Sequence, residues 1–262
     1  MAQNAPAGWK NYEDFAAGID TNRLPPSAAL VGQPLLFALP GSELALDIEG
    51  PNRVGWSWRG ERGHDWCEVI EVAPQTWFVD MTFEQRSLEA LTLVFNSATR
   101  RALAVPARVR SAEEAGAEPR VAQEFLVGTL GRDASAASGL VPHPSRDLIG
   151  LRTLQTYSPH HVYEHTYLSS TRYAWQCLKG EQRGHGDVDL STVFQFAENQ
   201  YLFTFREFII PVASTFFFNF DTLRSTGKFL GVTGAGCVAN NPAGAFIHEL
   251  SRSVYPDGIQ PA

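Results

Sequence analysis

The feature that most constrains the fold is a motif that occurs twice. The first copy is segment 53–65, RVGWSWRGERGHD, and the second is segment 172–185, RYAWQCLKGEQRGH. Each contains R-x-x-W, then a basic residue, Gly-Glu and, shortly afterwards, Arg-Gly-His. Further along, Trp77–Phe83 matches Tyr201–Glu207, and the residue-number offset between the copies rises from 119 to 124. Several matches in one order indicate a duplicated unit.

The repeated segments have the texture of β-strands. From residue 34 onward they are short, rich in β-branched and aromatic residues, and broken by Gly, Pro and Asn, as in Val54–Trp58 and Val162–Leu168. Such a pattern favours antiparallel sheets closed into barrels over alternating strands and helices. The fold class that we predict is all-β, with two tandem calycin- or lipocalin-like antiparallel β-barrels after a short helical lead-in.

Composition shifts suggest where the domains begin and end. Residues 1–33 form the lead-in, with a short helix expected within Trp9–Ala17 before the prolines that follow. The N-terminal barrel is expected at 34–130 and the C-terminal barrel at 148–262. Between them, residues 131–147 are rich in small residues and proline, which is typical of a linker.

Charge and cysteine usage exclude several classes of protein. The net charge is −7 and no basic block occurs, which argues against nucleic-acid binding. The three cysteines are widely spaced, as expected in a reducing compartment. No apolar stretch reaches the ~18–20 residues of a membrane span, and residues 1–6 lack the features of a secretory signal. We therefore expect a soluble cytoplasmic protein that does not act at a membrane.

Several motifs carry a family resemblance. In the second half they are Tyr163–His165, Arg172–Gly180, Tyr201–Glu207 and Arg224–Lys228, and in the first half they are Val54–Trp58 and Trp77–Phe83. Together these motifs resemble the molybdenum cofactor biosynthesis protein F (MoaF) family. The resemblance implies a two-domain, calycin-like architecture. It supplies no catalytic residues, because the family name records an association with a pathway.

Glu207 is the first candidate catalytic residue. It ends a strand face that we expect to point into the C-terminal barrel, and in the first repeat Phe83 stands at the same position. A carboxyl group in an apolar row has a raised pKa, which suits general acid–base chemistry. The alternative is that the strand ends there and Glu207 pairs with Arg206 or Arg172 at the rim.

The segment 160–165, HHVYEH, is the densest group of titratable residues. His161 and His165 could be metal ligands, but four residues along a strand separate them by ~13 Å, so we expect no metal. His165 and Tyr163 are instead candidate catalytic residues in the barrel lumen, able to move protons or orient a ligand. The alternative is that they are hydrogen-bonded core residues.

Aromatic residues and one arginine form the candidate ligand-binding set. Arg172 precedes Trp175 at the spacing that Arg53 and Trp56 have in the first copy. Such a pair could cover a ligand by a cation–π contact or bind an anion, or it could be purely structural. The full set is Trp175, Tyr201, Phe203, Arg172 and Phe205.

These residues favour a cofactor-independent enzyme of the lyase, isomerase or cyclase type. Its partner would be a small aromatic or carbonyl-bearing organic molecule, with proton transfer by His165, Glu207 or Tyr163. One alternative is a non-catalytic carrier or accessory protein, linked through the family to pterin and molybdenum cofactor biosynthesis. Another is an interaction scaffold with filled barrels. A homodimer stays open.

Overall fold

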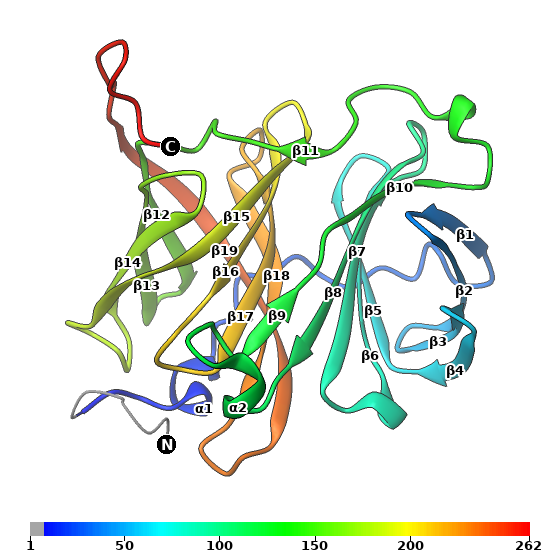
Figure 1. Cartoon of the computed structure of the whole chain (residues 1–262), viewed down its shortest axis with the longest axis horizontal. Helices are drawn as coiled ribbons and strands as arrows, with labels where there is room; N and C mark the ends of the chain where they lie inside the picture. The colour runs from blue at the N-terminus through cyan, green and yellow to red at the C-terminus, as the bar shows by residue number, and fades with distance from the viewer. Residues whose placement is uncertain (1–7) are drawn as a thin grey trace. The chain divides into compact units, whose positions relative to one another are not determined.

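The computed structural model describes residues 8–262, which form two compact β units (Figure 1). The N-terminal unit comprises residues 24–108 and 123–143. The C-terminal unit comprises residues 109–122 and 144–262 together with the segment 8–23, which comes before the N-terminal unit in the chain. The prediction of an all-β chain with two tandem antiparallel barrel-like units is confirmed.

The C-terminal unit is a closed barrel of eight antiparallel strands in chain order. These are β12 (Leu151–Ser158), β13 (His161–Tyr167), β14 (Arg172–Lys179), β15 (Gly186–Ala197), β16 (Gln200–Arg206), β17 (Val212–Asn219), β18 (Arg224–Val232) and β19 (Val238–Arg252). Each strand pairs with the next, and β19 pairs with β12, which closes the ring. Closure leaves this barrel without a free edge among its eight strands.

The N-terminal unit repeats this meander but is not closed. Its strands are β1 (Pro34–Leu39), β2 (Ser42–Gly50), β3 (Arg53–Trp58), β4 (Glu61–Asp65), β5 (Cys67–Ala73), β6 (Thr76–Thr82), β7 (Glu89–Asn96), β8 (Arg101–Val109) and β10 (Leu126–Leu130). The sheet order is β4-β3-β2-β1-β10-β8-β7-β6-β5, so β4 and β5 stand at its two ends.

The remaining elements are short. They are α1 (Tyr12–Ala16), the 3-10 turns Glu84–Arg86 and Ala134–Ala136, α2 (Ala112–Ala115), β9 (Val121–Gln123) and β11 (His143–Pro144). Helix α1 confirms the helix predicted within Trp9–Ala17. No helix of residues 8–262 has the length and apolar composition needed to cross a bilayer. The expectation that residues 1–6 are not a secretory signal concerns a segment outside the described residues.

The strand registers show how the two copies correspond. Cys67 lies opposite Met81 in the N-terminal unit, and Ser191 lies opposite Phe205 in the C-terminal unit, so these pairs match at an offset of 124. The shared register is the pattern expected of a duplicated unit. One difference is local, because β15 runs unbroken through the position at which Trp66 separates β4 from β5.

Helix α1 contributes to the core of the C-terminal unit. Tyr12, Phe15 and Ile19 are buried in the same apolar cluster as the inward-facing residues of the barrel strands. The Tyr12 hydroxyl donates a hydrogen bond to the backbone carbonyl of Phe229, at 2.7 Å. A fully buried side chain of this size contributes about 1.5–3 kcal/mol through the hydrophobic effect. Residues 12–19 of the lead-in are therefore part of the core of the C-terminal unit, whereas residues 24–33 belong to the N-terminal unit.

Candidate active site

A cavity lies inside the C-terminal unit. Strands β12–β14 line it with Tyr157, Tyr163, His165, Tyr173 and Trp175. The remaining lining residues are Gln182, Phe205, Glu207 and Phe229, with Phe15 and Ile19 from the N-terminal segment. The space open to the centre of a water molecule is about 30 Å³, enough for about two waters. A larger ligand therefore requires some of these residues to move.

The Glu207 carboxyl is the most perturbed acid of this cavity. The residue directly follows β16 and is only 7% exposed. Burial raises the pKa of Glu207 well above its usual value, and the neighbouring charges of Asp189 and Asp187 raise it further. Both effects favour the neutral, protonated form of this side chain. A protonated carboxyl in an apolar cavity can donate a proton to a bound molecule.

Asp189 lies beside Glu207 on the neighbouring strand. Leu190 pairs with Arg206, so Asp189 and Glu207 follow as the next positions across β15 and β16. Residues opposite each other on antiparallel strands have Cβ atoms about 5 Å apart. The indole Nε1–H of Trp175 donates to Asp189 Oδ2 at 2.9 Å, and the backbone N–H of Phe208 also interacts with this carboxyl.

The two carboxyls titrate as a pair. Desolvation raises the pKa of Asp189 to about 7, and the hydrogen bond from Trp175 opposes that rise. Two buried carboxyls this close do not both ionise readily, so near neutral pH they hold at least one proton between them. The pair can release a proton and take one back. We refer to Asp189 and Glu207 as the acid pair.

His165 is an uncharged hydrogen-bonding group. It is 3% exposed, and desolvation lowers its pKa to about 3. The edges and faces of Tyr173 and Phe203 surround it, with ring centroids at 5.3 and 6.0 Å. Its Nδ1 has no partner among the described residues. At neutral pH the ring can orient a ligand but does not carry a charge.

Tyr163 and Gln182 form the polar corner of the cavity. The Tyr163 hydroxyl donates to Gln182 Oε1 at 2.9 Å. Burial raises the pKa of Tyr163 far above its usual range, so the phenol stays neutral. Gln182 Nε2 has no partner in the described part of the chain. The corner therefore offers a buried N–H donor with nothing yet bound to it.

The other predicted ligand-binding residues divide into two groups. Trp175 and Phe205 line the cavity, as Tyr163, His165 and Glu207 do. Tyr201, Phe203 and Arg172 do not line it. The Tyr201 hydroxyl donates to Asp147 Oδ2 at 3.0 Å, Phe203 is completely buried against neighbouring rings, and the Arg172 guanidinium stands 5.5 Å from the centre of the Phe208 ring.

Sequence reasoning missed Asp189 and Gln182. A signal for Asp189 was present, because Asp65 stands at the same place in the first copy, 124 residues earlier. No comparable signal marks Gln182, whose role depends on how the turn before β15 folds back over the barrel. Tyr157 and Tyr173 were also missed as lining residues.

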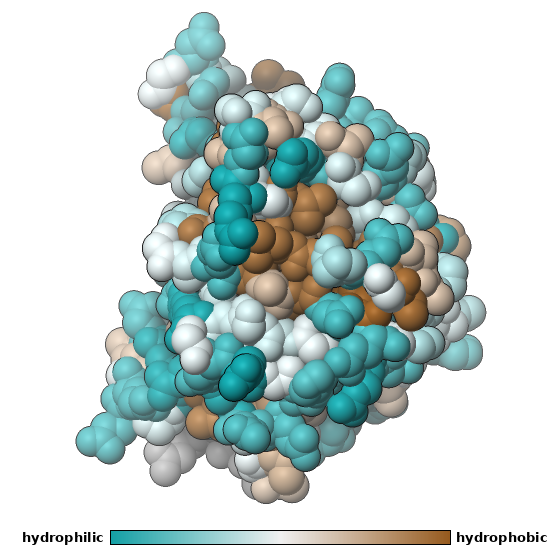
Figure 2. All heavy atoms as spheres, turned by 90° about the vertical axis from the view of Figure 1, so that its right-hand side faces the viewer, coloured by the Kyte–Doolittle hydropathy of each residue, from teal (hydrophilic) through white to brown (hydrophobic). Residues whose placement is uncertain are grey.

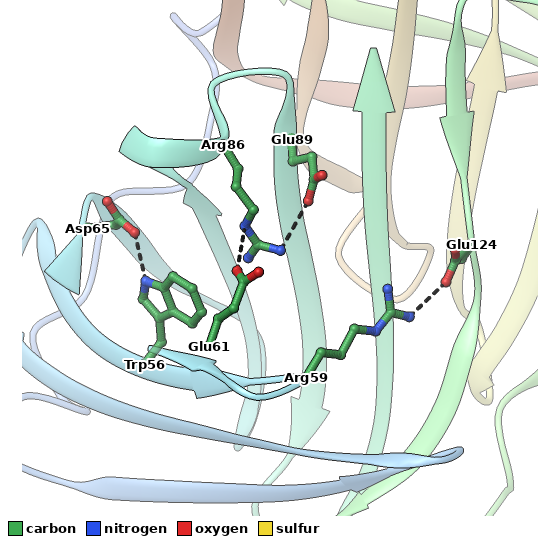
Figure 3. A network of polar contacts seen from close by, with 7 residues as sticks. All are labelled: Trp56, Arg59, Glu61, Asp65, Arg86, Glu89 and Glu124. Atoms are coloured by element: carbon green, nitrogen blue, oxygen red, sulfur yellow. Dashed lines mark hydrogen bonds and ion pairs between the residues drawn. The ribbon is translucent and has the colours of Figure 1, made fainter. Parts of the chain in front are cut away.

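The N-terminal unit holds the same tryptophan–aspartate contact in a different setting (Figure 3). Trp56 Nε1–H donates to Asp65 Oδ2 at 2.6 Å, and Asp65 Oδ1 accepts the backbone N–H of Glu84 at 3.0 Å. Phe83 takes the position of Glu207. The Arg86 guanidinium lies 4.0 Å from the centre of the Phe83 ring. It also pairs with the carboxylates of Glu61 and Glu89.

The N-terminal unit also has a hollow, which is open to solvent. Figure 2 looks onto the side of the molecule where β1–β4 lie and shows apolar side chains gathered in a hollow. Residues of β1–β4 and their turns line a groove of about 620 Å³. Its charged groups are partly exposed, as in the contact of His64 Nδ1 with Glu49 Oε1 at 2.6 Å. Buried titratable groups therefore favour the C-terminal cavity as the active site.

The N-terminal segment closes the C-terminal cavity. Trp9 stacks on His185 with centroids 5.0 Å apart and an interplanar angle of 8°. The Glu13 carboxylate accepts the backbone N–H of Gly234, at 3.0 and 2.9 Å to its two oxygens. Phe15 and Ile19 then form part of the cavity wall. Residues 9–19 thus pack against the barrel beside the cavity and form part of its wall, and we call them the cover segment.

Within residues 8–262, His, Cys, Asp and Glu side chains form no group of three or more that could hold a metal ion. The fold and the site together define a protein of two tandem β-barrel-like domains, with a largely apolar, aromatic-walled cavity that contains a few buried polar groups in the second. Models of the MoaF N-terminal domain and the MoaF C-terminal domain match residues 7–111 and 142–253.

Protein MoaF from Klebsiella aerogenes is 33% identical over 242 residues, which cover 86% of this chain and 87% of that protein. The chain belongs to the MoaF family. A solved structure from Burkholderia vietnamiensis, described provisionally as a beta-lactamase, covers 39% of this chain and 95% of its own, with 10% identity and a TM-score of 0.34. Likeness at that level is too low to define even the fold.

Proposed function

We propose that the C-terminal barrel binds a small organic molecule and catalyses a proton-transfer reaction of the lyase, isomerase or cyclase type without a resident cofactor. The observation that supports this most is the Glu207 carboxyl, protonated and buried in an aromatic-walled cavity. A group of this kind is costly to bury and adds nothing to an inert core. Strongly perturbed carboxyls in cavities are typical of acid–base catalysts.

The proposed chemistry uses the acid pair in both directions. Glu207 donates its proton to an oxygen or nitrogen of the substrate, and the carboxylate so formed takes a proton from a neighbouring carbon. Asp189 keeps the pair's total charge low during this exchange. Gln182 Nε2 and His165 orient the substrate, and the cover segment excludes water. General acid–base catalysis of this kind contributes about 10²–10⁴-fold to a rate.

A non-catalytic carrier or accessory role is the second candidate. Its support is the aromatic wall, which suits the stacking of a flat ring, and the family name, which associates MoaF with pterin and molybdenum cofactor biosynthesis. A carrier does not need the protonated carboxyl. The two candidates therefore differ in what happens when that carboxyl is changed.

The test compares the unaltered protein with Glu207→Gln. Each is incubated with a small-molecule extract of cells, and mass spectrometry follows which compounds bind and which are consumed. We expect the unaltered protein to convert one compound and Glu207→Gln to bind it but convert it about 10²–10⁴ times more slowly. Gln keeps the size and neutrality of the protonated acid, so folding should be unaffected.

The matched control is Asp65→Asn in the N-terminal unit, which should convert the same compound at the normal rate. Binding without conversion by all three proteins would establish the carrier role in place of catalysis. Equal conversion by the unaltered protein and Glu207→Gln would contradict the assignment of Glu207.

A further inference from the structure

No positively charged side chain of residues 8–262 lines the cavity, and the charges that act on Glu207 are those of neighbouring acids. Among the described lining residues there is no Lys or Arg, and Glu207 is the only carboxyl. Asp189 lies beside Glu207 on the neighbouring strand, and the charge of Asp187 also acts on Glu207. His165 cannot supply a compensating positive charge near neutral pH, because its burial opposes protonation. A phosphate or carboxylate in this cavity would therefore meet like charge and no counterion.

The nearby cations do not reach the cavity. Arg206 and Lys228 alternate with the inward-facing Glu207 and Phe229 along their strands, so they project from the opposite face of the barrel. Arg172 is close enough to Asp189 to favour its ionised form slightly, but its guanidinium stands over the ring of Phe208. It does not line the cavity, so the acid pair has no cation at hand on its cavity side.

Aromatic rings form most of the remaining cavity wall. The rings are those of Tyr157, Tyr163, Tyr173, Trp175, Phe205 and Phe229, which we call the aromatic wall. Tyr163 and Trp175 have centroids 6.0 Å apart at an interplanar angle of 54°, so their faces and edges are presented at different angles. The negative faces of such rings attract ammonium groups, most strongly where water is excluded.

We propose that the ligand of this cavity is a protonated amine, held as a cation by the acid pair within the aromatic wall. This inference rests on the proposed function, because it names the substrate class of the same site. Gln182 Nε2 would hydrogen-bond an acceptor elsewhere on the ligand. The amine nitrogen would occupy the place next to Glu207, the carboxyl that lines the cavity.

Binding of a cation should displace protons from the acid pair. The groups that face Glu207 are Asp187 and Asp189 from β15, Tyr163 from β13 and Tyr173 from β14. Both tyrosines stay neutral, so the acids alone respond to the incoming charge. An ammonium ion lowers the pKa of the pair, and protons leave as it binds. Affinity should therefore rise with pH until the amine itself loses its proton, near ~10.

The first experiment uses three probes of the same shape and different charge: benzylamine, benzyl alcohol and benzoate. Their binding is measured by titration calorimetry on the unaltered protein and on Phe15→Ala, which widens the cavity where the cover segment lines it. We expect benzylamine to bind at least about tenfold more tightly than either other probe. Calorimetry in two buffers that differ in ionisation enthalpy should show proton release.

The second experiment changes the acids. Glu207→Gln and Asp189→Asn should each weaken benzylamine binding about 10- to 100-fold and reduce proton release, whereas Asp65→Asn should leave both unchanged. Equal or tighter binding of benzyl alcohol or benzoate would overturn the proposal. So would an unchanged affinity in both acid variants, or no benzylamine binding to either the unaltered protein or Phe15→Ala.

The outcomes separate this inference from the proposed function. If amines bind through the acid pair but nothing in an extract is converted, catalysis is wrong and the amine site stands. If an uncharged compound is converted in a Glu207-dependent way and amines do not bind, the amine proposal is wrong and catalysis stands.

Discussion

The two units place the same hydrogen bond in opposite electrostatic surroundings. Trp56 donates to Asp65 at 2.6 Å and Trp175 donates to Asp189 at 2.9 Å. Asp65 also accepts the Glu84 N–H, whereas Asp189 has Glu207 as its neighbour. The tryptophan–aspartate pair is thus common to the fold, and the residue opposite the aspartate decides whether it becomes part of a titrating site.

The units differ in a second way, which concerns access. The N-terminal sheet is open between β4 and β5, and its groove faces solvent. The C-terminal barrel is closed by continuous pairing and covered by the cover segment. A buried acid keeps a raised pKa only where water is kept out. The raised pKa of Glu207 therefore depends on the closure of the barrel around it.

Exchanging the residues that distinguish the units should have the largest effect. In Phe83→Glu, a ring that is 3% exposed is lost from the core of the N-terminal unit. The new carboxylate would lie close to Arg86, whose guanidinium is 4.0 Å from the present ring centre. We expect a loss of about 3–5 kcal/mol in the free energy of unfolding, measured with urea. An unchanged stability would mean that Phe83 is not a core residue.

The acid pair should make stability fall as pH rises. The folded-state pKa of Asp189 is raised to about 7 by desolvation, above the unfolded value of ~3.9. Its neutral form is favoured in the folded state, so its contribution is fully present below pH ~4 and is lost as pH rises through about 7. We expect a decline of a few kcal/mol over that window. Asp189→Asn should reduce the decline in urea unfolding measured at pH 4 to 8.

His165 should make the free energy of unfolding fall as pH falls. Its folded-state pKa is lowered to about 3 by desolvation, below the unfolded value of ~6.5. Its contribution is present above pH ~6.5 and is lost as pH falls toward 3. His165→Phe should therefore flatten the acid side of the same stability curve, and an unaltered acid side would contradict the burial of His165.

Replacing each indole by a phenyl ring removes the N–H and a similar buried volume at both sites, so the difference between the two variants reports on the hydrogen bonds. Trp175→Phe leaves both Asp189 oxygens buried without a donor from the indole, and we expect a loss of about 1–3 kcal/mol. Trp56→Phe should cost about 1 kcal/mol less than Trp175→Phe, because the partly exposed Asp65 keeps the Glu84 N–H. Equal losses of stability in thermal unfolding would show that the two tryptophan–aspartate hydrogen bonds contribute equally.

The smallest effect is expected at the edge of the cover segment. Glu13→Gln weakens the contact with Gly234 and should cost about 0.5–1 kcal/mol or less. Ligand association in stopped-flow measurements should become faster, since the cover opens more often. Glu49→Gln beside the open groove of the N-terminal unit is the matched control and should leave this rate unchanged.

The sequence was most informative where the signal was local or repeated. The alternation in Tyr201–Glu207 predicted which face points inward, and the cavity is lined by Phe205 and Glu207 from that face. It could not show that Phe203 is enclosed by other rings or that the Tyr201 hydroxyl reaches Asp147. Those outcomes depend on strand curvature and on residues distant in the chain.

The cover segment shows more clearly that contacts between distant residues cannot be predicted from a local sequence pattern. The helix within Trp9–Ala17 was predicted from its own residues, but its partners are supplied by strands more than a hundred residues later. Nothing in the helix indicates which barrel it covers. Asp189 is an intermediate case. Its matching residue in the first copy of the repeat, Asp65, is visible in the sequence, but its burial beside Glu207 is not.

The contact between Tyr12 and Phe229 has a consequence for synthesis of the chain. The two residues are 217 positions apart, so at ~5–20 residues per second the ribosome needs roughly 10–40 s to supply the second after the first. The N-terminal unit, residues 24–108 and 123–143, is complete well before that time. The amphipathic helix α1 is made before the N-terminal unit and must therefore wait without its barrel partners while that unit folds, and this interval is when a nascent-chain chaperone would matter most.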